Sequence, residues 1–133
     1  MENKVEIPII IKYSRGVSLR KLRDWTHKLE KVELAEGITL QYDYSGTKAF
    51  KTPPEVLFLK LVLIPFIVGY FGHRMYPYID KAIDKLVDLF RQMSIEVIRI
   101  GKKKILVTQY SREELKQIIK EAIEEYIEIS EKS

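Results

Sequence analysis

The chain has 133 residues, of which 46% are hydrophobic and 32% are charged, and its formal net charge is +4 at pH 7. This composition excludes a globally disordered protein, and the length predicts a single domain over residues 1–133. The absence of cysteine excludes disulfides and thiolate metal sites. The first residues do not combine a basic segment with a cleavage site, so we expect no signal peptide and a cytoplasmic location.

The charges are unevenly distributed along the chain. Residues 111–133 are acidic, whereas the preceding residues carry the excess of lysine and arginine. Such an asymmetry favours self-association or the docking of a partner. Isoleucine, lysine and glutamate are abundant, and asparagine occurs once. This bias is typical of hyperthermophile proteins, so we expect a thermophilic source, although an AT-rich genome enriches the same residues.

The first part of the chain predicts a β-α-β arrangement. The segment 4–12 is short and rich in β-branched residues, which predicts a strand. Pro8 within it predicts an edge strand or a bulge. Ser18 is expected to cap a helix over residues 19–34, and Gly37 is expected to end it. Residues 38–44 alternate in polarity, which predicts a second strand.

The longest apolar run spans residues 56–72. Thr52 and Glu55 have the spacing of a capping box, so we expect a buried central helix that Pro65 kinks or breaks. A membrane-spanning helix is the alternative, but it requires about 20 apolar residues. The run is slightly shorter and includes Lys60, whose insertion into a bilayer is costly, so we do not expect a membrane span.

The last part of the chain predicts a helix, a hairpin and a second helix. The helix is expected to start at Pro77, and residues 95–100 and 104–108 flank a glycine turn, as in a β-hairpin. Ser111 and Glu114 form a capping box that opens the last helix. The predicted fold is α+β in the order β-α-β-α-α-β-β-α, a two-layer sandwich of about four strands with helices packed on one face.

Motifs for catalysis and phosphate binding are weak, so we expect no enzyme and no cofactor. Residues 44–48 contain Gly-Thr-Lys, whereas a phosphate loop requires Gly-Lys followed by Ser or Thr. An ordinary loop is therefore expected there. His27 and His73 have no catalytic partner at a suitable spacing in the sequence, and we expect surface or loop-packing roles for both.

An acidic ladder is formed by Asp80, Asp84 and Asp88, which lie four residues apart on one predicted helix face. Carboxylates at this spacing could hold Mg²⁺, but a helix face without a loop makes a poor cage. Basic residues of the same helix lie beside the ladder, and Arg91 follows Asp88 at the spacing of a surface ion pair. We therefore expect a solvated, ion-paired face and no metal.

Two binding functions are predicted, and the first uses protein contacts. A helix that is apolar on all sides must be covered, and a homodimer covers it most simply. Clustered aromatic residues and methionine are also typical of interfaces. The residues predicted for this interface are Phe58, Leu61, Ile64, Phe66, Tyr70, Phe71, Met75, Tyr76 and Tyr78.

The alternative function is nucleic-acid binding, in which lysine and arginine contact phosphates. The same charges also suit a solvated helix face and a hairpin protected against aggregation, so they do not by themselves identify a nucleic-acid-binding site. A third class is a membrane-associated protein that uses Val56–Phe71. The residues predicted to bind nucleic acid are Arg20, Arg23, Lys28, Lys31, Lys102, Lys103 and Lys104.

The order of elements and several short motifs resemble one protein family. Leu22–Trp25 reads Leu-Arg-Asp-Trp, Pro53-Pro54-Glu55 precedes the apolar run, residues 95–107 form the hairpin, and a terminal helix follows Ser111. Over most of the chain, this layout is similar to that of the small effector-associated constant component proteins of bacterial conflict systems. The resemblance implies a non-catalytic adaptor. A protein of an archaeal virus or plasmid, a class without a shared motif, is the alternative.

Overall fold

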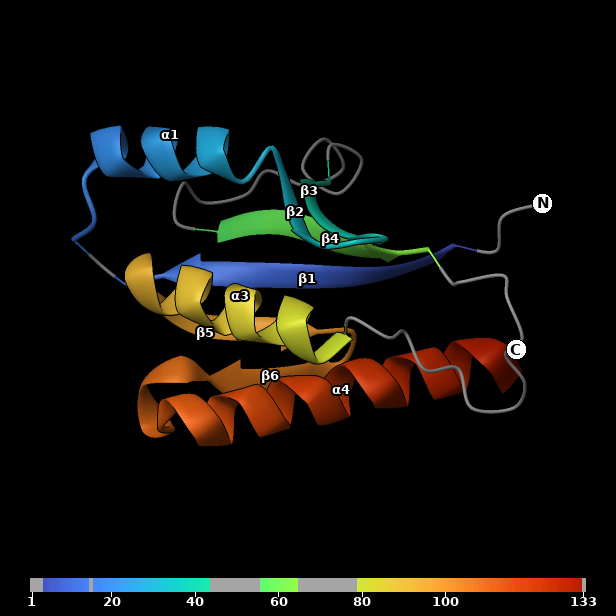
Figure 1. The fold of residues 1–133 in the computed structure, drawn as a ribbon. Helices are drawn as coiled ribbons and strands as arrows, with labels where there is room; N and C mark the ends of the chain where they lie inside the picture. Colours follow the sequence, from blue (N-terminus) through green and yellow to red (C-terminus); the bar gives the residue numbers. More distant parts are fainter. Residues whose placement is uncertain (1–3, 15, 44–55, 65–78, 133) are drawn as a thin grey trace.

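The structure is a computed structural model that describes residues 4–14, 16–43, 56–64 and 79–132 (Figure 1). Its strands form one antiparallel sheet of six strands in the order β2-β3-β4-β1-β5-β6. The elements are β1 (Val5–Tyr13), α1 (Leu19–Lys28), β2 (Lys31–Ala35), β3 (Ile38–Tyr42), β4 (Val56–Leu63), α3 (Ile79–Gln92), β5 (Ile95–Ile100), β6 (Lys103–Leu106), the short 3-10 helix η1 (Val107–Gln109) and α4 (Arg112–Lys132).

One face of the sheet is buried under helices. Along β1, Ile7, Ile9 and Ile11 are fully buried, whereas Pro8 and Lys12 are exposed. Helices α3 and α4 lie side by side against the buried face, and their apolar residues join those of the strands in one core (Figure 1). The predicted α+β class is confirmed, but the sheet has six strands instead of about four.

The prediction of a central helix is wrong for the described part of the apolar run, because Val56–Leu63 forms strand β4 inside the sheet. β4 pairs with Val5–Lys12 of β1 and with Ile38–Tyr42 of β3. A short apolar run has the same composition in a buried strand as in a buried helix, so its pattern does not separate them. Thr52 and Pro65 lie outside the described residues. Within the described ranges, no helix is long and apolar enough to cross a bilayer.

The first helix is shorter than predicted, because α1 ends at Lys28 and the chain then enters β2. Ser18 caps the helix as expected, since its Oγ accepts a hydrogen bond from the N–H of Lys21 at 3.2 Å. Gly37 does not end a helix. It lies in the turn between β2 and β3 with a φ of +80°, and its C=O accepts a hydrogen bond from the N–H of Ile64 at 2.8 Å.

Pro8 lies in a central strand and not at an edge, which corrects the prediction. It pairs with β4 on one side, and its C=O accepts a hydrogen bond from the N–H of Gly101 at 3.1 Å on the other. The ladder to β5 begins only at Ile9, and its register shifts between Lys12 and Tyr13, where β5 carries the extra residue Glu96. Because N–H and C=O of a strand residue point to the same neighbour, the N–H that proline lacks would face β5 where that ladder has ended.

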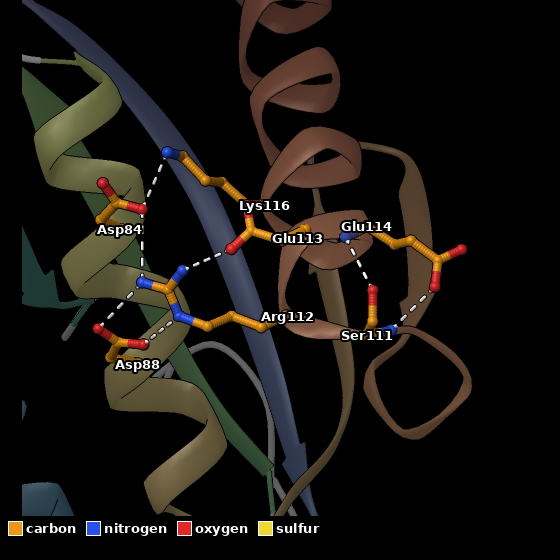
Figure 2. Close-up of polar contacts among 7 residues, drawn as sticks. All are labelled: Asp84, Asp88, Ser111, Arg112, Glu113, Glu114 and Lys116. Carbon is orange, nitrogen blue, oxygen red and sulfur yellow. Dashed lines mark hydrogen bonds and ion pairs between the residues drawn. The ribbon is translucent and has the colours of Figure 1, made fainter.

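The predicted hairpin and last helix are confirmed, but the second strand of the hairpin covers Lys103–Leu106 instead of residues 104–108, because η1 begins at Val107. The turn between β5 and β6 contains Gly101, whose φ is +58°. A Cβ atom on Gly101 would lie 2.7 Å from Cδ2 of Tyr126, so glycine is required both by the turn and by the close approach of α4. At the start of α4, the Ser111 N–H donates to Glu114 Oε1 at 3.1 Å, and the Glu114 N–H donates to Ser111 Oγ at 3.2 Å (Figure 2).

Candidate functional site

The sheet face that points away from α3 and α4, here called the outer face, has a distinct chemistry. Side chains alternate along a strand, and the odd-numbered residues of β1 and β4 are the ones that enter the core. The even-numbered residues and their partners across the sheet therefore point outward. The outer-face residues are Glu6, Pro8, Ile10, Lys12, Lys31, Glu33, Thr39, Gln41, Val56, Phe58, Lys60, Val62, Val97, Arg99, Lys104 and Leu106.

Two neighbouring rows of the outer face bring apolar and basic side chains together across β4, β1, β5 and β6. Adjacent strands are about 4.8 Å apart, so a row of four residues spans about 15 Å. The eight residues of these rows are named the basic–apolar patch. In strand order, the first row is Phe58, Ile10, Arg99 and Lys104, and the second row is Val56, Lys12, Val97 and Leu106.

The cations of the basic–apolar patch have no ion-pair partner among the described residues. Lys12, Arg99 and Lys104 are exposed, and within the described part of the chain no carboxylate forms an ion pair with any of them. The apolar members Ile10 and Phe58 are half-buried. β5 also carries Glu96, which is half-buried at the bulge opposite Lys12 and Tyr13. The patch therefore combines a local excess of positive charge with accessible apolar surface.

The opposite end of the outer face carries charges of both signs, three lysines and two glutamates. Lys60 Nζ lies 3.5 Å from Glu6 Oε1, and Lys4 Nζ lies 4.0 Å from the same oxygen. On the edge strand β2, the outward residues are Lys31 and Glu33, one of each sign. The positive potential of the outer face is consequently concentrated on the basic–apolar patch.

The charges between α3 and α4 are paired across the two helices (Figure 2). The aspartate ladder is ion-paired as predicted, but its partners lie on α4 and not beside it on α3. The closest pairs are Arg112 with Asp88 at 2.8 Å, Lys116 with Asp84 at 2.9 Å and Lys120 with Asp80 at 2.9 Å.

The contact with Arg112 favours the ionised form of Asp88. The hydrogen bonds that Arg112 donates keep the pKa of Asp88 below its usual value, and the charge of Arg91 adds a weaker effect. Hydrogen bonds from Ser111 lower the pKa of Glu114 in the same way. Among the described residues, no three His, Asp or Glu side chains are grouped as metal ligands.

The residues predicted for a dimer interface do not form one surface where they are described. Leu61 is 2% exposed and belongs to the core, so it is unavailable to a partner. Phe58 points to the outer face, and Ile64 is 41% exposed just after β4. Phe66, Tyr70, Phe71, Met75, Tyr76 and Tyr78 lie outside the described residues, as do the helix start at Pro77, residues 44–48 and His73.

The residues predicted to bind nucleic acid are divided among three places. Arg20, Arg23 and Lys28 are exposed on α1, and Lys102 lies in the turn after β5. Lys31 lies on the outer face but on the far edge strand, and Lys103 is exposed on β6. Of the predicted set, only Lys104 is a member of the basic–apolar patch.

Sequence reasoning missed Lys12 and Arg99, although a signal was present. Each lies two residues from an apolar residue on the same strand face, Ile10 and Val97 respectively. Alternation therefore placed each cation beside apolar surface on its own strand. The pairing of β1 with β5, which places Arg99 next to Ile10, could not be inferred from the sequence.

A polar hollow of about 350 Å³ lies where β1 leads into α1. It is lined by Ser14, Gly16, Val17, Ser18, Lys21 and Ser94. The hydroxyl of Ser18 is already engaged as the cap of α1. His27, which lies on the same helix, is exposed, and its Nδ1 lies 4.0 Å from a carboxylate oxygen of Glu30. These groups fit a structural role at the helix ends.

No protein-family model, curated protein or solved structure matches the chain. The resemblance to the effector-associated constant component proteins therefore stays a prediction.

Proposed function

We propose that this domain acts by binding rather than by catalysis, and that its ligand is a nucleic acid held on the basic–apolar patch. The observation that carries this proposal is the group of exposed cations, Lys12, Arg99 and Lys104, for which the described residues supply no ion-pair partner. Cations held close together repel one another, and the phosphates of a polyanion relieve that repulsion while counterions are released.

The position of the patch supports a polymeric ligand. Its cations lie on three neighbouring strands, with Arg99 and Lys104 directly paired and Lys12 one row away. Directly paired residues are about 5 Å apart and diagonal neighbours about 7–8 Å apart. A phosphate backbone repeats its charge along an extended chain, so it can contact several of these cations at once. A small anion would contact one or two.

An acidic protein is the main competing ligand, because an adaptor of the resembling family would bind a protein. Nucleic acid is preferred here because its charge repeats at every nucleotide and because its bases offer flat surfaces to the apolar residues. Competition between nucleic acid and an acidic polypeptide for the patch can be measured with poly-glutamate.

Self-association is a second candidate function, favoured by the exposed apolar side chain of Ile64. It would use the chain after β4 and not the basic–apolar patch, because a two-fold contact through the patch would bring two positive surfaces together. Light scattering is expected to show a dimer that Ile64→Asp weakens. A monomer at high protein concentration would exclude this second function.

The test of nucleic-acid binding compares two triple variants with equal loss of charge. The first replaces Lys12, Arg99 and Lys104 by glutamine, and the control replaces the exposed α3 residues Lys81, Lys85 and Arg91 by glutamine. Affinity for a fluorescent 12-nucleotide single strand is measured by anisotropy at several salt concentrations. Because each phosphate contact to a single strand contributes about −0.7 to the salt slope, the wild type should show a slope of about −2.

The patch triple is expected to lose affinity by about 10-fold or more at low salt and to lose most of its salt slope. The control triple should retain both, although its net charge is the same. Equal losses in the two triples, or no binding by the wild type at low salt, would overturn the proposal. Equally strong competition by poly-glutamate would assign the patch to an acidic protein instead.

A further inference from the structure

We infer that the basic–apolar patch selects single-stranded over double-stranded nucleic acid, with bases on its apolar residues and phosphates on its cations. This inference rests on the proposed function and names the class of ligand for the same surface. Cations and apolar residues are neighbours in both rows: Ile10 lies next to Arg99 in one row, and Lys12 lies between Val56 and Val97 in the next.

The proximity of cations and apolar residues matters because a duplex and a single strand present different chemistry. In a duplex the bases are stacked inside and the accessible surface consists of phosphates, sugars and narrow base edges. Apolar side chains next to the cations would gain little from it. A single strand exposes base faces, which pack on aromatic and apolar side chains while the backbone follows positive charge.

The shape of the surface supports the same conclusion. The major groove of B-DNA admits one α-helix or a two-stranded ribbon. The patch instead occupies the broad face of a six-stranded sheet, on strands β4, β1, β5 and β6, and β1 has a paired neighbour on both sides. Such a face cannot enter a groove, but an extended strand can lie across it. In one common RNA-binding module, the aromatic residues of a four-stranded sheet stack two or three bases.

The carboxylates of the outer face limit where that strand can lie. Glu6 and Glu33 share a row near the far end of β1, where Glu6 is paired with Lys60. Phosphates approaching this row would meet negative charge and an ion pair that must be broken. This negative charge favours a bound strand on the rows of the patch, where Phe58 is the aromatic member.

The experiment separates base contacts from phosphate contacts with two substitutions at one position. Phe58→Leu keeps an apolar side chain but removes the ring, and Phe58→Tyr keeps the ring. Each protein is titrated with a 12-nucleotide single strand, with the duplex of the same sequence and with inorganic polyphosphate. Thermal unfolding of each variant confirms that it is folded before the affinities are compared.

Wild type should bind the single strand about 10-fold more tightly than the duplex. Phe58→Leu should weaken single-strand binding by about 5-fold or more, since stacking on an aromatic ring is lost. The salt slope and the binding of polyphosphate should be unchanged, and Phe58→Tyr should bind within about 2-fold of wild type. Duplex binding as tight as single-strand binding, or no effect of Phe58→Leu, would refute the inference and leave the proposed function standing. Failure of every polymer to bind would refute both.

Discussion

Two sets of three cations have opposite surroundings in this molecule. Each of the three α4 cations that face α3 has an aspartate oxygen at 2.8–2.9 Å. Each of the three cations in the basic–apolar patch lacks an ion pair within the described residues. Both sets consist of one arginine and two lysines, so residue type does not distinguish them. Their neighbours do: the paired set joins two helices, and the unpaired set is available to a ligand.

The largest expected effect is the difference in stability loss between a buried and an outward-facing position of one strand. Leu61 is 2% exposed on the core side of β4, and the adjacent Lys60 points outward. Leu61→Ala should lower the free energy of unfolding by about 2–5 kcal/mol, because it leaves a cavity in the core. Lys60→Ala should change it by no more than about 0.5 kcal/mol. Urea unfolding measures both, and similar losses would contradict the assignment of the two faces.

A smaller effect is expected at the turn where the hairpin meets α4. Gly101→Ala should cost about 2–4 kcal/mol, because its positive φ disfavours a side chain and the new Cβ would lie 2.7 Å from Tyr126. Gly16→Ala is the matched control, since Gly16 also has a positive φ but open space around its Cβ position. The control should lose only about 1 kcal/mol. Urea unfolding of both variants measures the contribution of the Tyr126 contact, and equal losses would show that the contact is unimportant.

The smallest expected effect concerns the pH dependence of stability, which should differ between variants of a paired and of an unpaired cation. The pKa of Asp88 is lowered in the folded protein by its hydrogen bonds to Arg112. Its stabilising contribution is therefore present above the carboxyl pKa of the unfolded chain, about 4, and is lost as the pH falls through the lower folded-state pKa. Glu114 contributes with the same sign through Ser111.

Melting temperatures at pH 7, 5, 4 and 3 measure this contribution. Arg112→Ala should lower the melting temperature by a few degrees at pH 7 and should make its fall toward pH 3 shallower. The residual pH dependence includes the part that Glu114 contributes. Arg99→Ala removes an unpaired cation and should leave the pH profile unchanged. A profile altered equally by both substitutions would show that the pairing is not what distinguishes the two sets.

Elements with local signals were predictable from the sequence. The caps at Ser18 and Ser111 were identified from hydroxyls placed before helical patterns, and both make the expected hydrogen bonds. The hairpin around Gly101 was identified from a glycine turn between two β-branched runs. Each of these features depends on residues a few positions apart, so the information is contained in a short window.

The errors arose where distant strands decide the local structure. Val56 and Phe58 face outward in β4 but are apolar, so the strand lacks the polar alternation that would have identified it. Val32 fits the apolar stripe of a longer helix, yet Val32 and Leu34 also alternate with charged neighbours, and pairing with β3 makes them part of β2. In both cases the sheet partner outweighs the local pattern.

The candidate site was predictable only in part for the same reason. Lys104 was identified within a run of lysines at the hairpin turn, but its proximity to Arg99 and Lys12 depends on the register of three strands. Likewise, the aspartate ladder on α3 was recognised, while its partners on α4 were not. A sequence gives the period of each charged face, and tertiary packing decides which faces meet.

The position of β1 inside the sheet has a consequence for how the chain is made. This apolar strand ends at Tyr13, but the ladder that covers its second side is complete only after Ile100 has been added. At about 5–20 residues per second on a ribosome, the strand waits roughly 4–17 seconds for that partner. During this interval, the row of backbone N–H donors along one edge of the nascent strand is interrupted at Pro8, which has no N–H. The residue that ends a ladder in the finished sheet thus also hinders premature pairing with other nascent chains.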